Sequence, residues 1–88
     1  TQKKVYVGKG THYFPKAKIG QFKIEAYDIK IGDKILVTGP STGAQEMIID
    51  EMFVNDLSAE KATKGDDCTF KLPFRIRMSD KLYKIVDA

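Results

Sequence analysis

The sequence predicts an all-β fold, a single small β-barrel closed by about six strands. Apolar and polar residues alternate with a period of two along most of the chain, which is typical of strands with one buried face. Clusters of Gly, Pro, Ser and Asp separate these segments at short intervals. A closed barrel also leaves no exposed strand edges, which would otherwise promote aggregation. These observations favour one all-β domain over 1–88.

The first two expected strands lie near the N-terminus. A strand over 4–7 is expected to end at Gly8 and Gly10. The next strand covers 19–26, where the apolar residues before and after Gly20 have opposite parity. Because an extra residue shifts the phase of the alternation and glycine accepts the required backbone, this change predicts a bulge near Gly20.

The remaining strands follow clusters of turn-forming residues. A strand over 34–38 directs Ile35 and Val37 inward and ends at 39–43, whose composition predicts a hairpin connection. Three further strands are expected at about 45–54, 68–72 and 82–86. The only plausible helix lies at about 56–64 and would be too short to be stable by itself.

Three expected strands begin near a short turn signature, in which a glycine or a serine is followed by aspartate: Gly32-Asp33, Gly65-Asp66 and Ser79-Asp80. Glycine adopts a positive φ without steric cost, and an aspartate side chain accepts hydrogen bonds from nearby backbone N–H groups. We therefore expect each pair to form a tight turn that leads into a strand.

Length and composition indicate one globular domain. The chain has 88 residues, of which 42% are hydrophobic and 31% charged, and a domain of this size has only a thin core. Charged residues interrupt every apolar stretch well short of the roughly 20 residues that a membrane-spanning helix needs. The chain begins at Thr1 and not at an initiator Met, so we interpret it as an excised module of a longer protein. It has no recognisable secretory signal, and we expect no membrane partner.

The single cysteine and the single histidine limit the chemistry. Cys68 cannot form an internal disulfide, which favours a reducing compartment, and the alternation directs its side chain into the core. His12 stands far from Cys68 in the sequence, without the spacing of a zinc site and without a carboxylate to orient it. We expect a cytoplasmic chain that has no cofactor, no metal and no catalytic residue, and that is not an enzyme by itself.

Charge is unevenly distributed along the chain. The net charge is +3, but 1–40 holds eight lysines and three acidic residues, 41–67 two lysines and seven acidic residues, and 68–88 five basic and two acidic residues. A basic face built from both ends of the chain would attract phosphate backbones or an acidic protein surface. The alternative is a set of solvated strand faces.

The segment 9–16 is the most distinctive in composition. His12, Tyr13 and Phe14 lie between lysines in an expected loop that Gly and Pro delimit. Such rings stack on bases while lysines contact phosphates. Alternatively, Tyr13 and Phe14 fill one mouth of the barrel, and His12 is solvated.

A second candidate contact follows Pro73. Arg75 and Arg77 are expected to share one face of a strand, where they form either a forked contact with an anion or solvated edge charges. The complete candidate surface for RNA or a protein partner comprises Lys9, His12, Tyr13, Lys16, Lys18, Arg75 and Arg77.

Two segments in the middle of the chain form a recognisable pair: IKIGDKILVTG at 29–39 and ATKGD at 62–66. They resemble domain II of elongation factor Tu and related translation GTPases. In that family a Gly-Asp turn opens a strand that ends at glycine, and a later Ala-x-x-Gly-Asp opens another. The resemblance implies the same small β-barrel.

A longer ordered set of motifs covers nearly the whole chain: VGKGTHYFP at 7–15, IGD at 31–33, TGPSTG at 38–43, LPFRIR at 72–77 and SDKLYKIV at 79–86. This set is similar to the C-terminal domain of collagenase-like peptidases, which form peptidase family U, number thirty-two. In that family a larger N-terminal domain carries the chemistry and the small barrel follows it. Some members are described as proteases, whereas relatives take part in hydroxylating RNA or ubiquinone precursors with an iron–sulfur cluster on clustered cysteines, which this chain lacks.

The resemblance implies a non-catalytic accessory domain of a collagenase-like peptidase. Such a domain would position substrate or a partner against the N-terminal catalytic domain of the same protein. One alternative is an RNA-binding module like the translation-factor barrel. A second alternative is a structural module for dimerisation or interdomain packing.

Overall fold

Antiparallel pairing organises the chain, which the computed structural model describes over 1–88. The all-β prediction is confirmed, since the structure contains no helix and therefore no helix that could cross a membrane. Its ten strands are β1 (Gln2–Phe14), β2 (Ile19–Ile24), β3 (Asp28–Lys30), β4 (Lys34–Gly39), β5 (Gly43–Ile48), β6 (Phe53–Val54), β7 (Leu57–Ser58), β8 (Lys61–Thr63), β9 (Asp67–Lys71) and β10 (Lys81–Asp87).

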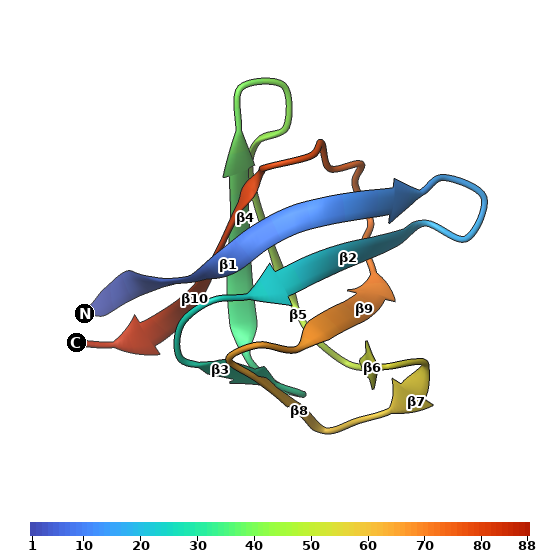
Figure 1. Cartoon of the computed structure of the whole chain (residues 1–88). Coiled ribbons are helices and arrows are strands. Elements are labelled where there is room, and N and C mark those ends of the chain that lie inside the picture. The colour runs from blue at the N-terminus through green and yellow to red at the C-terminus, as the bar shows by residue number, and fades with distance from the viewer.

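Eight of these strands form one curled sheet in the order β5-β4-β10-β1-β2-β9-β6-β7, and β3 and β8 form a separate ladder. In Figure 1, β1 and β2 cross the front of the molecule while β4 and β5 stand behind them, so the sheet curves around its inner face. β5 pairs only with β4, and β7 pairs only with β6. The hydrogen-bonded ladder thus has two edges, and its closure into a barrel stays a prediction.

β1 is much longer than the sequence predicts. An end was expected at Gly8 and Gly10, but the strand continues through both to Phe14. A Cβ atom on Gly8 would overlap the carbonyl oxygen of Lys23 in β2. Glycine is therefore needed inside this strand because the two backbones approach closely, and it does not end the strand.

The expected bulge lies in β1 rather than near Gly20. The register between β1 and β2 shifts between Gly10 and His12, which makes Thr11 the extra residue of the bulge. β2 itself pairs regularly, with Ile19 half-buried on the outer face of the sheet. Because Ile19 does not point into the core, no change of phase is needed in β2.

The helix expected at 56–64 is not formed. Asn55 and Asp56 have φ angles of 52° and 63°, which a right-handed helix does not allow. They turn the chain between β6 and β7, and β8 then pairs with β3, where Ala62 is buried opposite Ile29. Pairing between distant segments overrides a weak local helix propensity here.

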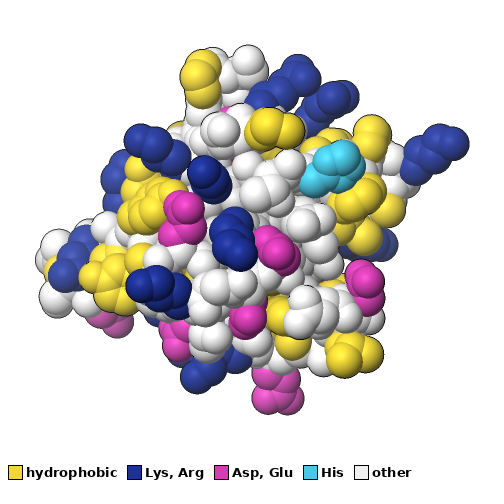
Figure 2. All heavy atoms as spheres, viewed as in Figure 1, with side chains coloured by type: hydrophobic (Ala, Val, Ile, Leu, Met, Phe, Trp, Pro, Cys, Tyr) yellow, Lys and Arg dark blue, Asp and Glu magenta, His cyan; other side chains and the backbone are white.

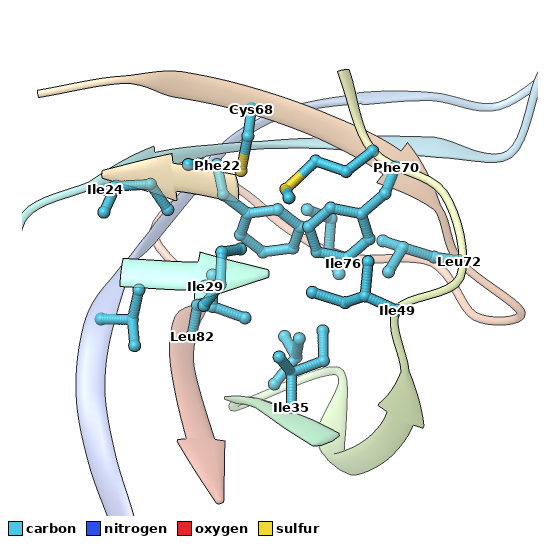
Figure 3. Close-up of a cluster of buried hydrophobic side chains, with 14 residues drawn as sticks. Phe22, Ile24, Ile29, Ile35, Ile49, Cys68, Phe70, Leu72, Ile76 and Leu82 are labelled. Atoms are coloured by element: carbon cyan, nitrogen blue, oxygen red, sulfur yellow. The ribbon is translucent and has the colours of Figure 1, made fainter. Parts of the chain in front are cut away.

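One core of 14 buried apolar residues fills the inner face of the curled sheet. Phe22 and Phe70 stack near its centre with 5.1 Å between ring centroids and an interplanar angle of 13°, and Figure 3 shows Cys68 beside them. The inward orientation of Ile35 and Val37 and the burial of Cys68 are confirmed, since all three are fully buried.

The three predicted aspartate turns share one geometry. In each turn a backbone N–H donates to the carboxylate three residues later, and the N–H of that aspartate donates back to the first residue's carbonyl. The distances from N to carboxylate oxygen are 3.0 Å for Lys30–Asp33, 2.8 Å for Thr63–Asp66 and 2.9 Å for Arg77–Asp80. The residue before each aspartate has a positive φ: 96° at Gly32, 95° at Gly65 and 71° at Ser79.

Asp80 differs from the other two turn aspartates because its side chain is buried. The carboxylate also accepts a hydrogen bond from the Thr42 hydroxyl, and a Cβ atom on Gly39 would overlap it. Its backbone carbonyl accepts the N–H of Gly10 at 2.7 Å. The third turn thereby connects the start of β10 to the β4–β5 hairpin and to β1.

Candidate functional site

The seven residues of the predicted surface come from four places in the fold. Arg75 and Arg77 do not share a strand face, because Pro73 cannot donate to a ladder and the chain runs irregularly from there to the Asp80 turn. The segment 9–16 is mostly strand and not a loop. The seven residues lie on the outer face of β1 (Lys9, His12), on the opposite face of β1 (Tyr13), in the β1–β2 turn (Lys16, Lys18) and between β9 and β10 (Arg75, Arg77).

Tyr13 links two of these places. Its ring packs against the core, as expected for a side chain that fills one end of the curled sheet. The guanidinium carbon of Arg75 lies 5.7 Å from the centroid of this ring. A cation over an aromatic ring at an exposed site contributes about 0.5–1 kcal/mol, so the contact positions Arg75 beside the end of β1.

His12 and Phe14 form an exposed aromatic pair on the outer face. Their ring centroids are 4.4 Å apart with an interplanar angle of 62°. Phe14 is 40% exposed, so the expectation that it fills the barrel together with Tyr13 is wrong, because alternation places the two rings on opposite faces. Figure 2 shows the imidazole in cyan beside exposed hydrophobic side chains. Such a pair offers a stacking surface to a base or an apolar group.

A row of three lysines crosses the outer face next to this pair. Lys9 of β1 stands directly opposite Lys81 of β10 and directly opposite Lys23 of β2. Neither Lys9 nor Lys81 forms an ion pair, and the ammonium of Lys23 donates to the carbonyl of Gly65 at 3.1 Å. Because like charges directly opposite each other destabilise a sheet, an anionic ligand would relieve repulsion in this row.

Two members of this row, Lys23 and Lys81, are missing from the predicted surface. Alternation places both on the outer face, but only the strand register brings them next to Lys9. A hairpin symmetric about 15–18 would give the pairing of Lys9 with Lys23 to within one residue, the difference being the bulge at Thr11. The pairing of β1 with β10 joins the two ends of the chain and has no such local signal.

A groove of about 550 Å³ forms a second candidate surface, and no lysine of the row lines it. The N–H of Leu72 donates to the carbonyl of Lys18 at 2.9 Å, which ties the β1–β2 turn to the segment after β9. This places Lys16 and Lys18 close to Lys71, which is not part of the predicted surface. The groove is lined by these three lysines, by Asp50 and by apolar residues that include Met47, Ile48 and Leu72.

Three groups with displaced pKa values lie outside both surfaces. Burial raises the pKa of the Cys68 thiol to about 12, and the hydrogen bond to Glu25 raises the pKa of Tyr6 to about 12. The hydrogen bond from Lys84 lowers the pKa of Asp28 below its ordinary value. Each displacement follows from a contact within the fold, and no three His, Cys, Asp or Glu side chains gather into a group that could hold a metal ion.

Two solved structures share the fold of this chain. The C-terminal domain of a U32 peptidase from Geobacillus thermoleovorans matches in two crystal structures, each with a TM-score of 0.83, at 16% and 17% identity. The matches cover 89% and 90% of this chain and 96% and 90% of the two solved chains. At this identity they show a shared fold. No family model matches the chain.

Sequence comparison leads to particular relatives. Over 84 residues, or 96% of its length, the chain is 40% identical to a collagenase of Porphyromonas gingivalis. Over 81 residues it is 31% identical to an uncharacterized protease of Methanocaldococcus jannaschii. The chain spans only 20% of the length of either relative. The resemblance to the C-terminal domain of collagenase-like U32 peptidases, predicted from the ordered motifs, is thereby confirmed.

Proposed function

We propose that this chain is the accessory C-terminal module of a collagenase-like peptidase, and that it positions a protein substrate or partner against a catalytic domain of the same protein. We also propose that the curled sheet closes into a barrel like domain II of elongation factor Tu, and that the protein is cytoplasmic. The observation that carries it is the extent of the match, because 96% of the chain aligns with one fifth of a collagenase. A unit of this size corresponds to one domain of a longer protein.

The test is made in the full-length gene product that contains this chain, with 1–88 removed. For a protein substrate, KM is expected to rise about tenfold, which corresponds to about 1.4 kcal/mol of lost binding free energy. Cleavage of a short peptide should stay within about twofold, since a short peptide reaches only the catalytic domain. An equal loss of both activities in a folded protein, or no loss of either, would contradict the proposal, as would a gene product of only 88 residues.

A second candidate function is RNA binding at the outer face. The observation that favours it is the row of Lys81, Lys9 and Lys23 beside the exposed pair of His12 and Phe14. Lysines at adjacent strands would contact phosphates while the rings stack on bases, as in other single-strand binding sheets.

This candidate is tested by titrating the 88-residue chain with a single-stranded RNA at two salt concentrations. Three phosphate contacts predict that affinity falls about 20-fold between 50 and 200 mM salt. Lys9→Glu should abolish binding, whereas Lys61→Glu, on the separate β3–β8 ladder, should change it less than about twofold. Binding that ignores both salt and Lys9→Glu would exclude this face as an RNA site.

A further inference from the structure

β5 has hydrogen-bonded partners on one side only. Its six residues form a ladder with β4, and no backbone hydrogen bond outside the strand ladders involves 43–48. Alternate residues of an antiparallel strand direct their N–H and C=O groups to opposite sides. Half of the β5 peptide groups therefore face away from β4 and have no partner in the protein.

This edge lacks the usual protection against pairing with another chain. β5 contains no proline, and its register with β4 has no bulge. Its one charged side chain, Glu46, is held in an ion pair with Lys34 of β4 at 3.2 Å. Natural edge strands usually carry lysines, prolines or bulges that prevent strand addition, so this edge remains competent to accept a strand.

The inner face of the sheet is also uncovered at β5. Gln45 and Met47 stand opposite Val37 and Ile35, which are both fully buried. Gln45 nevertheless is exposed, and Met47 is only half-buried. Met47 still packs against the core, but the rest of β5 is exposed, so one more strand beside β5 would extend the covered face.

The groove continues from this edge. Met47 and Ile48 line it from β5, and Leu72 and Pro73 line it from the segment after β9. β9 pairs with β2 and β6 and makes no ladder with β5, and the groove is lined from both of these parts of the chain. Ile48 is 62% exposed, and the volume of about 550 Å³ suits the side chains of a bound segment.

Lysines dominate the charge around the groove. Lys16, Lys18 and Lys71 line it together with one carboxylate, Asp50. None of the three lysines takes part in an ion pair within the chain. Their charge is free to attract carboxylates of a ligand and to repel basic segments.

We propose that an extended, acidic peptide segment binds here as a strand added to β5, with apolar side chains in the groove and carboxylates at the three lysines. A peptide repeats its donors and acceptors at about 3.4 Å per residue, which matches the free edge of a strand, whereas a nucleic acid offers no such repeat. The site is complete within these 88 residues, so it goes beyond the accessory role and does not depend on peptidase activity.

The test uses a fluorescent octapeptide of alternating Glu and Val, titrated with the 88-residue chain. Two further peptides are N-methylated at the odd or at the even residues, which removes the N–H donors from one side of the peptide or from the other. One methylated peptide is expected to bind at least about tenfold more weakly and the other within about twofold of the parent, because only one side faces β5. Hydrogen exchange should slow at the amides of 43–48 when the parent peptide binds.

The charge requirement is tested separately. The double variant Lys18→Glu and Lys71→Glu should weaken binding at least about tenfold, and Lys61→Glu within about twofold, with folding checked by circular dichroism. A peptide with Lys in place of Glu should not bind. No binding at about 1 mM chain, equal binding of both methylated peptides, or β5 amides already protected by dimerisation of the free chain would overturn the proposal.

Discussion

Of the three aspartate turns, only the turn at Asp80 has a buried carboxylate. Its side chain is 2% exposed and accepts hydrogen bonds from the backbone N–H of Arg77 at 2.9 Å and from the hydroxyl of Thr42. Asp80→Ala removes both acceptors at once. The N–H of Arg77 and the hydroxyl of Thr42 are then left without these partners at a part-buried site.

The magnitude follows from these two contacts. A hydrogen bond to a charged acceptor contributes about 1.5–3 kcal/mol. Part of this is offset because alanine avoids the desolvation of a buried carboxylate. We therefore expect Asp80→Ala to lower the free energy of unfolding by about 2–4 kcal/mol, out of about 4–13 kcal/mol for a domain of this length. The corresponding fall in Tm is about 10–30 °C.

The chain supplies its own controls for this experiment. Asp33→Ala and Asp66→Ala break the same turn bond, at 3.0 and 2.8 Å, in turns that are exposed to solvent. Each is expected to lower the free energy of unfolding by about 0.5–1.5 kcal/mol, measured by urea titration with far-UV circular dichroism. If Asp80→Ala equals these controls within about 0.5 kcal/mol, burial of the carboxylate is not the origin of its effect.

Three further predictions concern single groups. Ser79→Gly should raise the free energy of unfolding by about 0.5–1 kcal/mol, because Ser79 has a φ of 71°. Gly65→Ser, which places serine at the equivalent position of another turn, should lower it by at least as much in the same urea titrations. Asp28→Asn should lower the stability by less than about 1 kcal/mol at about pH 7. This difference should vanish as pH falls below 3.8 through the lowered pKa of Asp28, because a protonated Asp28 no longer attracts the charge of Lys84. Cys68 should not react with a thiol reagent in the native chain, because burial raises its pKa to about 12, and rapid labelling without denaturant would contradict its placement.

Local chemistry explains the parts of the fold that the sequence predicts well. Ile35 and Val37 are placed by alternation, and the aspartate turns by residue pairs whose hydrogen bonds span three residues. The length of β1 could not be predicted in this way. Glycine is required at position 8 because the carbonyl of Lys23 approaches it, and Lys23 belongs to a different strand. The prediction of a helix at 56–64 is wrong for the same reason, because pairing with the distant strand β3 makes 61–63 a strand.

The candidate surfaces were harder to predict than the core. Lys9, His12, Lys16 and Lys18 were recognisable from composition, but the structure divides them between the outer face and the groove. Their neighbours in space come from β9 and β10, at the other end of the chain. Alternation says which face a side chain occupies, and only the register between strands says which side chains meet.

The two surfaces differ in how they would engage a ligand. The lysine row lies on β10, β1 and β2, and each of these strands is paired on both sides, so the row is held in place before any ligand binds. β5 is an edge strand whose free peptide groups gain partners only from an added segment. An accessory module that brings a substrate to a catalytic domain needs two contact regions that can be occupied together. The basic outer face and the free edge of β5 are two candidates for such regions, on different strands of these 88 residues.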